Sequence, residues 1–318
     1  MSAAVERCCL DLNGFTILTE AASGPYAVTP VLAAMAGANV WALAGNTQYA
    51  TSLELEATVL DLARRAGVAD RVQLTVEKTP EVTGAADIVT NSGQVRPIDA
   101  AMVAQMKSSA VIALMYESWE YRESDVDLQA CRARHIPVAG TNESHPAVDA
   151  LAFVGVMAIK QLHDAGVAVY HSRIVLLCDN AFAPFIAQSL RGAGADVAEA
   201  SRLTAEVLSP PCDAVLFAQR PSCGYQFNAA DAGLLAGHAP DAVFVHYWGD
   251  ADFPALAAAG ILVWPPAPPS KGHMGILPSA VGPEPVVRLQ AGGLKVGELL
   301  ARGLGRACPQ ARPLVQLI

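Results

Sequence analysis

The sequence predicts an α/β fold made of two Rossmann-like, doubly wound parallel-sheet domains that face a cleft. Short apolar segments alternate with helix-like segments of ten or more residues along the chain, which is typical of βαβ units. The composition is 53% hydrophobic and only 16% charged, as expected for strands that are buried on both faces. A length of 318 residues is sufficient for two domains with separate cores.

The first half of the chain alternates between strand-like and helix-like segments. The strand-like segments are short and apolar: "FTILTEA", "VWALAG", "RVQLTV", "ADIVTN", "SAVIALMYE" and "IPVAGT". The helix-like segments include "TPVLAAMAGA", "TSLELEATVLDLARRAG", "PIDAAMVAQMK" and "DVDLQACRARH". This alternation predicts a first Rossmann-like domain over residues 1–148.

The second half repeats the alternation after a predicted helix, "PAVDALAFVGVMAIKQLHDAG", that starts at Pro146. The segments that follow are "SRIVLLCD", "FIAQSLRGAGADVAEAS", "DAVLFAQR", "DAVFVHYWG", "FPALAAAG" and "ILVWPP", which predict a second domain over residues 149–285. The segment "WPPAPPSKGHMGILPSAVGPEP" is rich in Pro and Gly, so we expect a long loop with a binding role. The C-terminal helical segment, 286–318, is a candidate to pack back on the first domain.

Charge and hydropathy exclude several classes of partner. The net charge of −9 and the lack of a basic stripe argue against nucleic acid. No apolar run approaches the roughly 18 residues that a membrane span requires. The first residues, "MSAAVERCCLDLNG", lack the charged-then-apolar order of a secretory signal, so we expect a cytoplasmic protein.

Cysteine and histidine spacing argues against a metal site. The seven cysteines form no C-x-x-C pair, so we expect reduced thiols. These cysteines are Cys8, Cys9, Cys131, Cys178, Cys212, Cys223 and Cys308. A site assembled from Glu143, His145, His246, Asp250 and His273 would require separate loops to converge, and no H-x-x-x-H spacing supports it. We therefore expect no metal.

Two stretches resemble a known family. The stretch "ADIVTNSGQVRPIDAAMVAQM" followed by "SAVIALMYESWEYRESDVDLQACRARHIPVAGTNESHP" resembles the substrate-binding domain of D-2-hydroxyacid dehydrogenases, the family of formate and glycerate dehydrogenases. "IVLLCDNAFAPFIAQSLRGAGADV" stands where that family has its phosphate-binding turn, and "SKGHMG" stands where it has Thr-Pro-His-x-Gly. The resemblance covers about residues 86–300. It implies that residues 1–148 form a substrate domain, that residues 149–285 form a nucleotide-binding-type domain, and that the protein is a homodimer.

The resemblance implies NAD or NADP as cofactor, bound at residues 178–183 in an altered mode. The three glycine positions of G-x-G-x-x-G hold Cys178, Asn180 and Ala183, and Phe182 lies in the same turn. Two of these residues add bulk where the pyrophosphate of the family's cofactor approaches the backbone. Glu199, about 20 residues further on, is the candidate to bind a ribose hydroxyl.

The predicted catalytic residues come from the resemblance and from the ends of predicted strands. His273 matches the family's acid–base histidine, whereas Trp248 stands at the position of its carboxylate-binding arginine. Ligands of open parallel sheets bind beyond the C-terminal ends of strands, so polar residues there are candidates. The candidate catalytic residues are His273, Arg122, Glu143 and His145. The candidate substrate-binding residues are Asn91, Arg96, Glu117, Asn142, Tyr247 and Trp248.

Each candidate also has a purely structural interpretation. Asn91 and Asn142 are good helix caps, Glu117 is able to form local ion pairs, His145 precedes a predicted helix, and Tyr247 suits a core position. Three functions therefore stay open. The first is an oxidoreductase-like enzyme of small-molecule metabolism that acts on a carboxylate-bearing substrate with altered NAD(P) binding. The second is a non-redox lyase or group-transfer enzyme without a dinucleotide, and the third is a non-catalytic small-molecule-binding protein.

Overall fold

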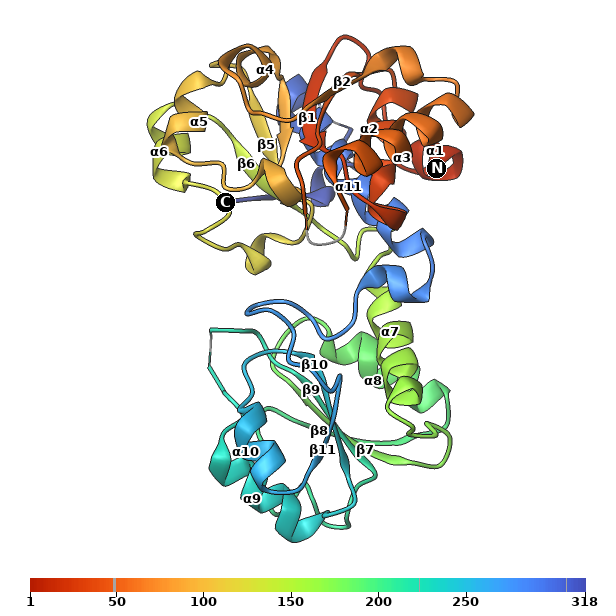
Figure 1. Cartoon of the computed structure of the whole chain (residues 1–318). Helices are drawn as coiled ribbons and strands as arrows, with labels where there is room; N and C mark the ends of the chain where they lie inside the picture. Colours follow the sequence, from red (N-terminus) through yellow and green to blue (C-terminus); the bar gives the residue numbers. More distant parts are fainter. Residues whose placement is uncertain (48–49, 223, 307) are drawn as a thin grey trace. The chain divides into compact units, whose positions relative to one another are not determined.

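The computed structural model describes residues 1–47, 50–222, 224–306 and 308–318. The chain divides into two compact units (Figure 1). Unit 1 consists of Met1–Ala150 together with Pro283–Ile318, and unit 2 consists of Leu151–Gly282. Each unit has a largely or wholly parallel sheet with helices on both faces, which confirms the predicted α/β class.

The sheet of unit 1 has seven strands in the order β12-β6-β5-β4-β1-β2-β3. The strands are β1 (Thr16–Glu20), β2 (Asn39–Leu43), β3 (Val72–Thr75), β4 (Ile88–Thr90), β5 (Val111–Ala113), β6 (Val138–Thr141) and β12 (Val315–Leu317). All pairings are parallel except that of β12, which runs antiparallel to β6. After β3 the chain returns to the other side of β1, so the loops after β1 and β4 diverge and leave a switch point between these strands.

Two layers of helices cover the sheet of unit 1 (Figure 1). One layer contains α1 (Ser2–Arg7), α2 (Val28–Met35), α3 (Ser52–Arg65) and α11 (Glu284–Arg302). The other contains α4 (Pro80–Ala85), α5 (Ala100–Gln105) and α6 (Leu128–Ala133). Separate apolar clusters pack on the two faces, so both faces of the strands are buried. This burial explains why a central strand such as β5 is continuously apolar rather than alternating.

Helix α11 packs closely on the sheet of unit 1 because its inner face carries glycines. A Cβ at Gly293 would lie 2.4 Å from Met115 Sδ, and one at Gly297 would lie 2.5 Å from Ile88 Cγ2. Helix α11 contacts β4, β5 and β6, which places the last long helix of the chain in the core of unit 1.

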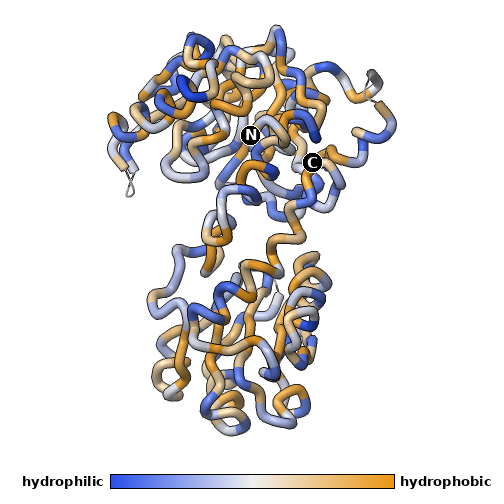
Figure 2. The backbone as a smooth tube through the Cα atoms, turned by 90° about the vertical axis from the view of Figure 1, so that its right-hand side faces the viewer, coloured by the Kyte–Doolittle hydropathy of each residue, from blue (hydrophilic) through white to orange (hydrophobic). Residues whose placement is uncertain are grey.

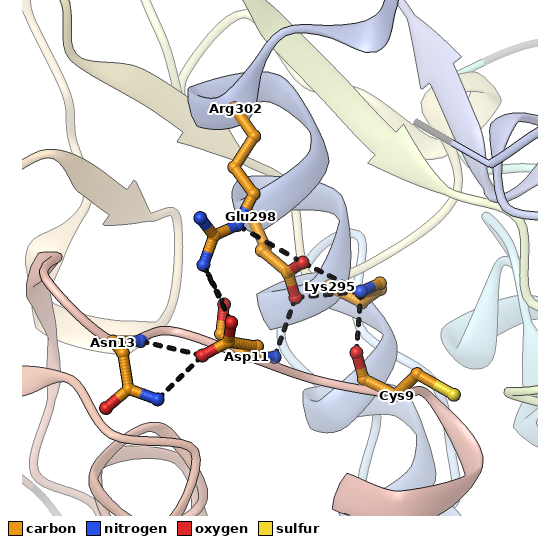
Figure 3. A network of polar contacts seen from close by, with 6 residues as sticks. All are labelled: Cys9, Asp11, Asn13, Lys295, Glu298 and Arg302. Carbon is orange, nitrogen blue, oxygen red and sulfur yellow. Dashed lines mark hydrogen bonds and ion pairs between the residues drawn. The ribbon is translucent and has the colours of Figure 1, made fainter. Parts of the chain in front are cut away.

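A buried polar network joins α11 to the chain segment before β1 (Figure 3). Lys295 Nζ donates to Cys9 O at 2.7 Å and to both carboxylate oxygens of Glu298. Glu298 Oε2 also accepts the backbone N–H of Asp11 at 2.9 Å, and Arg302 bonds to Asp11 from the last turn of the helix. Because both members of the Lys295–Glu298 pair are buried and hydrogen-bonded, the pair is satisfied without water.

The sheet of unit 2 has five parallel strands in the order β11-β10-β9-β7-β8. The strands are β7 (Arg173–Cys178), β8 (Asp196–Ala200), β9 (Ala214–Ala218), β10 (Val243–Trp248) and β11 (Leu262–Trp264). The helices are α7 (Ala152–Asp164), α8 (Ala183–Gly192), α9 (Ala229–His238) and α10 (Phe253–Ala258). Helices α9 and α10 pack on an aromatic cluster on one face, and α7 packs against α8, which contacts β7. The switch point of this sheet lies between β7 and β9.

The hydropathy of the chain alternates along its length. Figure 2 shows hydrophobic and hydrophilic stretches that alternate along the chain in both units. Among the described residues, none of the helices is both long and apolar enough to span a membrane. Six of the seven cysteines are free thiols, and Cys223 lies outside the described residues.

The boundaries of two elements differ from the prediction. The helix predicted to start at Pro146 begins only at Ala152, because Asp149 adopts a left-handed φ of 49° and the chain turns before the helix. Strand β10 extends to Trp248, so His246 and Tyr247 lie inside a strand rather than in the loop after it. The Pro- and Gly-rich segment is a loop as predicted, with one short 3₁₀ turn at Pro278–Val281.

Candidate active site

The carboxyl end of the unit 1 sheet carries charged and polar side chains after four neighbouring strands. Asp125 is the centre of one group. Its buried carboxylate accepts a hydrogen bond from Tyr116 Oη at 2.8 Å, and it forms ion pairs with Arg96 at 3.2 Å and Arg122 at 3.4 Å. Two guanidinium groups therefore share one carboxylate, and this group of three charged side chains keeps one positive charge in excess. Burial and the Asp125 charge raise the pKa of the Tyr116 hydroxyl, so it stays a donor.

Three carboxyl groups form a second group after β5 and β6. Glu117 Oε1 accepts the backbone N–H of Glu143 at 3.0 Å, and Glu117 Oε2 accepts the indole N–H of Trp119. Glu120 Oε1 accepts the backbone N–H of Glu117 at 3.3 Å. Glu143 is 8% exposed, and burial followed by the charges of Glu120 and Glu117 raises its pKa well above the ordinary range. A raised pKa favours the protonated form of a carboxyl, which is the form that donates a proton.

Asn91 follows β4 and is hydrogen-bonded to the segment after β5. Its Oδ1 accepts the backbone N–H of Met115 at 2.8 Å. Its Nδ2 is buried and has no hydrogen-bond partner among the described residues. An amide donor without a partner in a buried position costs free energy unless a ligand or water satisfies it. Asn91 is thus placed by the fold and keeps one donor available.

Glu20 was not predicted from the sequence. It ends β1, at the switch point of the sheet, and lines a cavity of about 370 Å³. Burial raises its pKa from 4.5 to about 7, although the charge of Arg96 and the backbone N–H of Gln94 both oppose this rise. The signal in the sequence was an acid that ends an otherwise apolar strand, "TILTE", ahead of a Gly-Pro turn.

Asn142 and His145 hold the C-terminal segment of the chain. Asn142 Nδ2 donates to Pro313 O at 2.9 Å, while its Oδ1 accepts from Ser144. His145 Nε2 lies 3.0 Å from Gln310 O, and its Nδ1 accepts the backbone N–H of Ala147 at 3.2 Å. Both ring nitrogens of His145 are therefore used in local structure, and neither side chain belongs to the two groups above.

In unit 2, the turn after β7 is closed by its own side chain. Asn180 Nδ2 donates to Ala218 O at 2.7 Å, across the switch point, and Asn180 Oδ1 accepts the backbone N–H of Phe182 at 3.0 Å. The Asp179 carboxylate accepts the backbone N–H of Arg220 at 3.1 Å beside it. The side-chain amide thus fills the path between β7 and β9 and occupies one of the N–H groups that a phosphate needs. These residues do not fit the pyrophosphate of a dinucleotide in the usual mode.

The other predicted cofactor residues have structural partners. Burial raises the pKa of the Cys178 thiol to about 11. Ala183 begins α8, and Phe182 packs against the Trp248 ring with centroids 5.5 Å apart. Glu199, near the end of β8, forms an ion pair with Arg191 at 2.7 Å.

The predicted residues on β10 and on the long loop lie in different environments. Tyr247 is fully buried, and its hydroxyl donates to Val154 O at 2.9 Å, so it belongs to the core of unit 2. The indole N–H of Trp248 donates to Gly272 O at 3.2 Å, and Gly275 N donates to Tyr247 O. These two bonds anchor the loop on either side of His273, which is exposed. Among the described residues, no cluster of three or more His, Cys, Asp or Glu suits a metal ion.

Comparison with known proteins identifies the fold. No family model matches the chain, and no curated protein sequence matches it. Among solved structures, a dipicolinate synthase chain from Bacillus subtilis is similar, with 12% identity and a TM-score of 0.58 over 94% of this chain and 100% of that one. A dipicolinate synthase chain from Bacillus halodurans has 10% identity and a TM-score of 0.54, covering 88% of this chain and 96% of that one. A D-lactate dehydrogenase from Treponema pallidum has 11% identity and a TM-score of 0.54, covering 93% and 98%.

These similarities extend over nearly the full length of both chains at very low identity. The chain therefore has the two-domain fold found in D-2-hydroxyacid dehydrogenases, and the predicted resemblance is confirmed for the fold. The positions that carry function in this chain must be argued from its own side chains.

Proposed function

We propose that the chain is an enzyme of small-molecule metabolism that carries out acid–base chemistry on a carboxylate-bearing substrate at the carboxyl end of the unit 1 sheet. The observation that carries this proposal is the group formed by Arg96, Arg122 and Asp125. Its two guanidinium groups share a single carboxylate, at 3.2 and 3.4 Å, and so keep one positive charge for an anion. Arg122 is the more exposed of the two guanidinium groups, which suits planar recognition of a carboxylate.

Glu143 is the candidate proton donor of this enzyme. Its pKa is raised by burial and by the neighbouring Glu120 and Glu117 charges, which favours the protonated form that donates. Glu117 is a positioning residue, because its carboxylate accepts the backbone N–H of Glu143 and fixes that loop. Asn91 contributes a buried N–H donor from the next loop.

NAD(P)-dependent oxidoreduction is the second candidate function. The fold shared with a D-lactate dehydrogenase supports it. The closed turn at Asn180 opposes it, because the amide would have to release Ala218 O before phosphate could enter. Hydride transfer on this chain requires a binding mode other than the glycine-rich turn. His273, on its anchored loop, stays the candidate acid–base residue for that chemistry.

Ligand binding tests the two candidates separately. We expect small carboxylates such as pyruvate or malonate to bind to the wild-type protein in calorimetry, and we expect Arg122→Gln to weaken that binding at least tenfold. Arg132→Gln, an exposed arginine on α6, is the matched control and is expected to bind as wild type does. Equal affinity in Arg122→Gln and wild type would contradict the proposal.

Titration with NADH and NADPH decides the second candidate. Saturable binding at micromolar cofactor would favour the oxidoreductase, whereas no binding at millimolar cofactor would leave the non-redox enzyme. The expected homodimer stays a prediction, and light scattering coupled to gel filtration measures it.

A further inference from the structure

The cavity beside Glu20 lies within unit 1 at the switch point between β1 and β4. Glu20 and Ser23 line it from the end of β1, and Gly93 and Gln94 line it from the segment after β4. Its volume of about 370 Å³ falls in the range of small-molecule sites. In an open parallel sheet this is the position where ligands bind.

The Glu20 carboxyl is built into the wall of this cavity. Gly93 has a left-handed φ of 40°, and a Cβ at that position would lie only 1.4 Å from Glu20 Oε2. The glycine therefore lets the chain fold directly over the carboxyl. The backbone N–H of Gln94, which follows, is close enough to the same group to lower its pKa. A carboxyl held against the backbone in this way has a fixed position, which a binding group needs.

The described lining residues carry hydroxyl groups, an amide and the Glu20 carboxyl, and they include no lysine, arginine or histidine. Arg96, the cation whose charge acts on Glu20, is ion-paired with Asp125 and is not part of the lining. An anion entering the cavity would therefore lie beside a carboxyl with no cation in the described wall. A cation would gain a charge-assisted hydrogen bond in a partly desolvated place.

We propose that this cavity binds the protonated amino group of a small molecule, with the ammonium donating to the Glu20 carboxylate and to the hydroxyl of Ser23. The amine site itself is argued from the cavity alone. The inference rests on the proposed function only where it assigns the amino group to the substrate, which would then carry both an amine and a carboxylate. An ammonium group favours the ionised form of Glu20. Because the carboxyl is largely protonated below its pKa of about 7, binding at pH 6 releases a proton.

Calorimetry with ethanolamine tests this inference on the full chain. We expect saturable binding at pH 6, with a measured enthalpy that differs between two buffers of different ionisation enthalpy, as proton release requires. Ethylene glycol, which lacks the charge, and sodium acetate, which reverses it, are expected not to bind at this cavity. Glu20→Gln is expected to weaken ethanolamine binding at least tenfold and to abolish the buffer dependence. Glu56→Gln, an exposed glutamate on α3, is the matched control.

The result that overturns the inference is ethanolamine binding of equal strength in Glu20→Gln, or acetate binding that depends on Glu20. The absence of ethanolamine binding to wild type also overturns it. A ¹³C-carboxyl NMR titration of Glu20 in the wild-type protein is a second measurement that does not depend on the variant folding. It is expected to report a lower pKa with ethanolamine present.

The two proposals fail separately. Pyruvate binding that requires Arg122, without ethanolamine binding, would leave the proposed function and remove the amine site. Ethanolamine binding that requires Glu20, without any carboxylate binding, would do the opposite.

Discussion

The ionisation of Glu20 gives the sharpest quantitative prediction. Burial raises its pKa from 4.5 to about 7 in the folded protein. Ionising this carboxyl therefore costs about 3 kcal/mol more in the folded state than in the unfolded chain. Since the folded pKa lies above the unfolded one, the contribution of Glu20 to stability is fully present below pH 4.5 and is lost as the pH rises to 7. Above pH 7 the loss is complete.

Glu20→Gln removes this titration while keeping a side chain of the same shape. We expect the stability of the variant relative to wild type to increase by about 2–3 kcal/mol between pH 5 and pH 8.5. Hydrogen exchange of peptides from β1 and β2 measures this in unit 1 alone, as a relative protection factor that rises by a factor of about 50. Variant and wild type are compared at each pH, so the intrinsic pH dependence of exchange cancels.

Glu56→Gln, on the exposed face of α3, is the control for removal of one negative charge. Its protection relative to wild type is expected to stay constant with pH. The protection factor of Glu20→Gln divided by that of wild type is the quantity to follow. If this ratio is also constant from pH 5 to 8.5, the reasoning is refuted, because Glu20 then has the same pKa in the folded and unfolded states.

Three further changes test the packing and the turn. Gly293→Ala places a methyl group 2.4 Å from Met115 Sδ, so we expect a loss of about 1–3 kcal/mol in denaturant unfolding. Lys295→Met removes the nearer of the two cations beside the buried Glu298 and leaves Arg302 at 3.5 Å, so it is expected to cost about 3 kcal/mol, whereas adding Glu298→Leu should restore most of that stability in the same assay. Asn180→Gly opens the turn after β7, so we expect NADH affinity to increase in a fluorescence titration. Unchanged NADH affinity would show that Asn180 is not what blocks the turn.

The fold class was predictable because its signal is local and repeated. The segment "SRIVLLCD" became β7, and "TSLELEATVLDLARR" became α3 with a capping box between Thr51 and Glu54. Apolar run length, helix period and cap residues each depend on a few neighbouring residues, so the sequence is enough to identify them. Strand order was implied only through the family resemblance.

The candidate site was predictable in part. Arg96, Arg122 and Glu143 were chosen because they follow strands, and they do lie at the carboxyl end of the unit 1 sheet. The pairing of Arg96 and Arg122 through Asp125 depends on where the loop after β5 folds, which no local pattern encodes. His145 bonds to Gln310, which lies 165 positions away in the sequence, so its structural role depends on a contact invisible to motif analysis. Tyr247, a candidate substrate-binding residue, lies inside β10, where its buried hydroxyl donates to Val154 O, as the structural interpretation of this residue expected.

In both sheets the strand order reverses beside the first strand, which creates a switch point. The two switch points differ in the hydrogen-bond and ion-pair partners of their polar side chains. In unit 2, Asn180 donates to Ala218 O at the end of β9 and accepts the backbone N–H of Phe182 in its own turn, so this N–H is not available to a phosphate. In unit 1, Glu20 lines a cavity whose described wall carries no cation, and Arg122 shares its counter-ion with Arg96. A charged side chain that lacks a full set of partners lowers stability. Such side chains cluster at functional sites, where a ligand supplies the missing partner. For that reason we propose that the chemistry of this chain takes place on the unit 1 sheet, although the fold it shares with dehydrogenases would direct attention to the turn after β7.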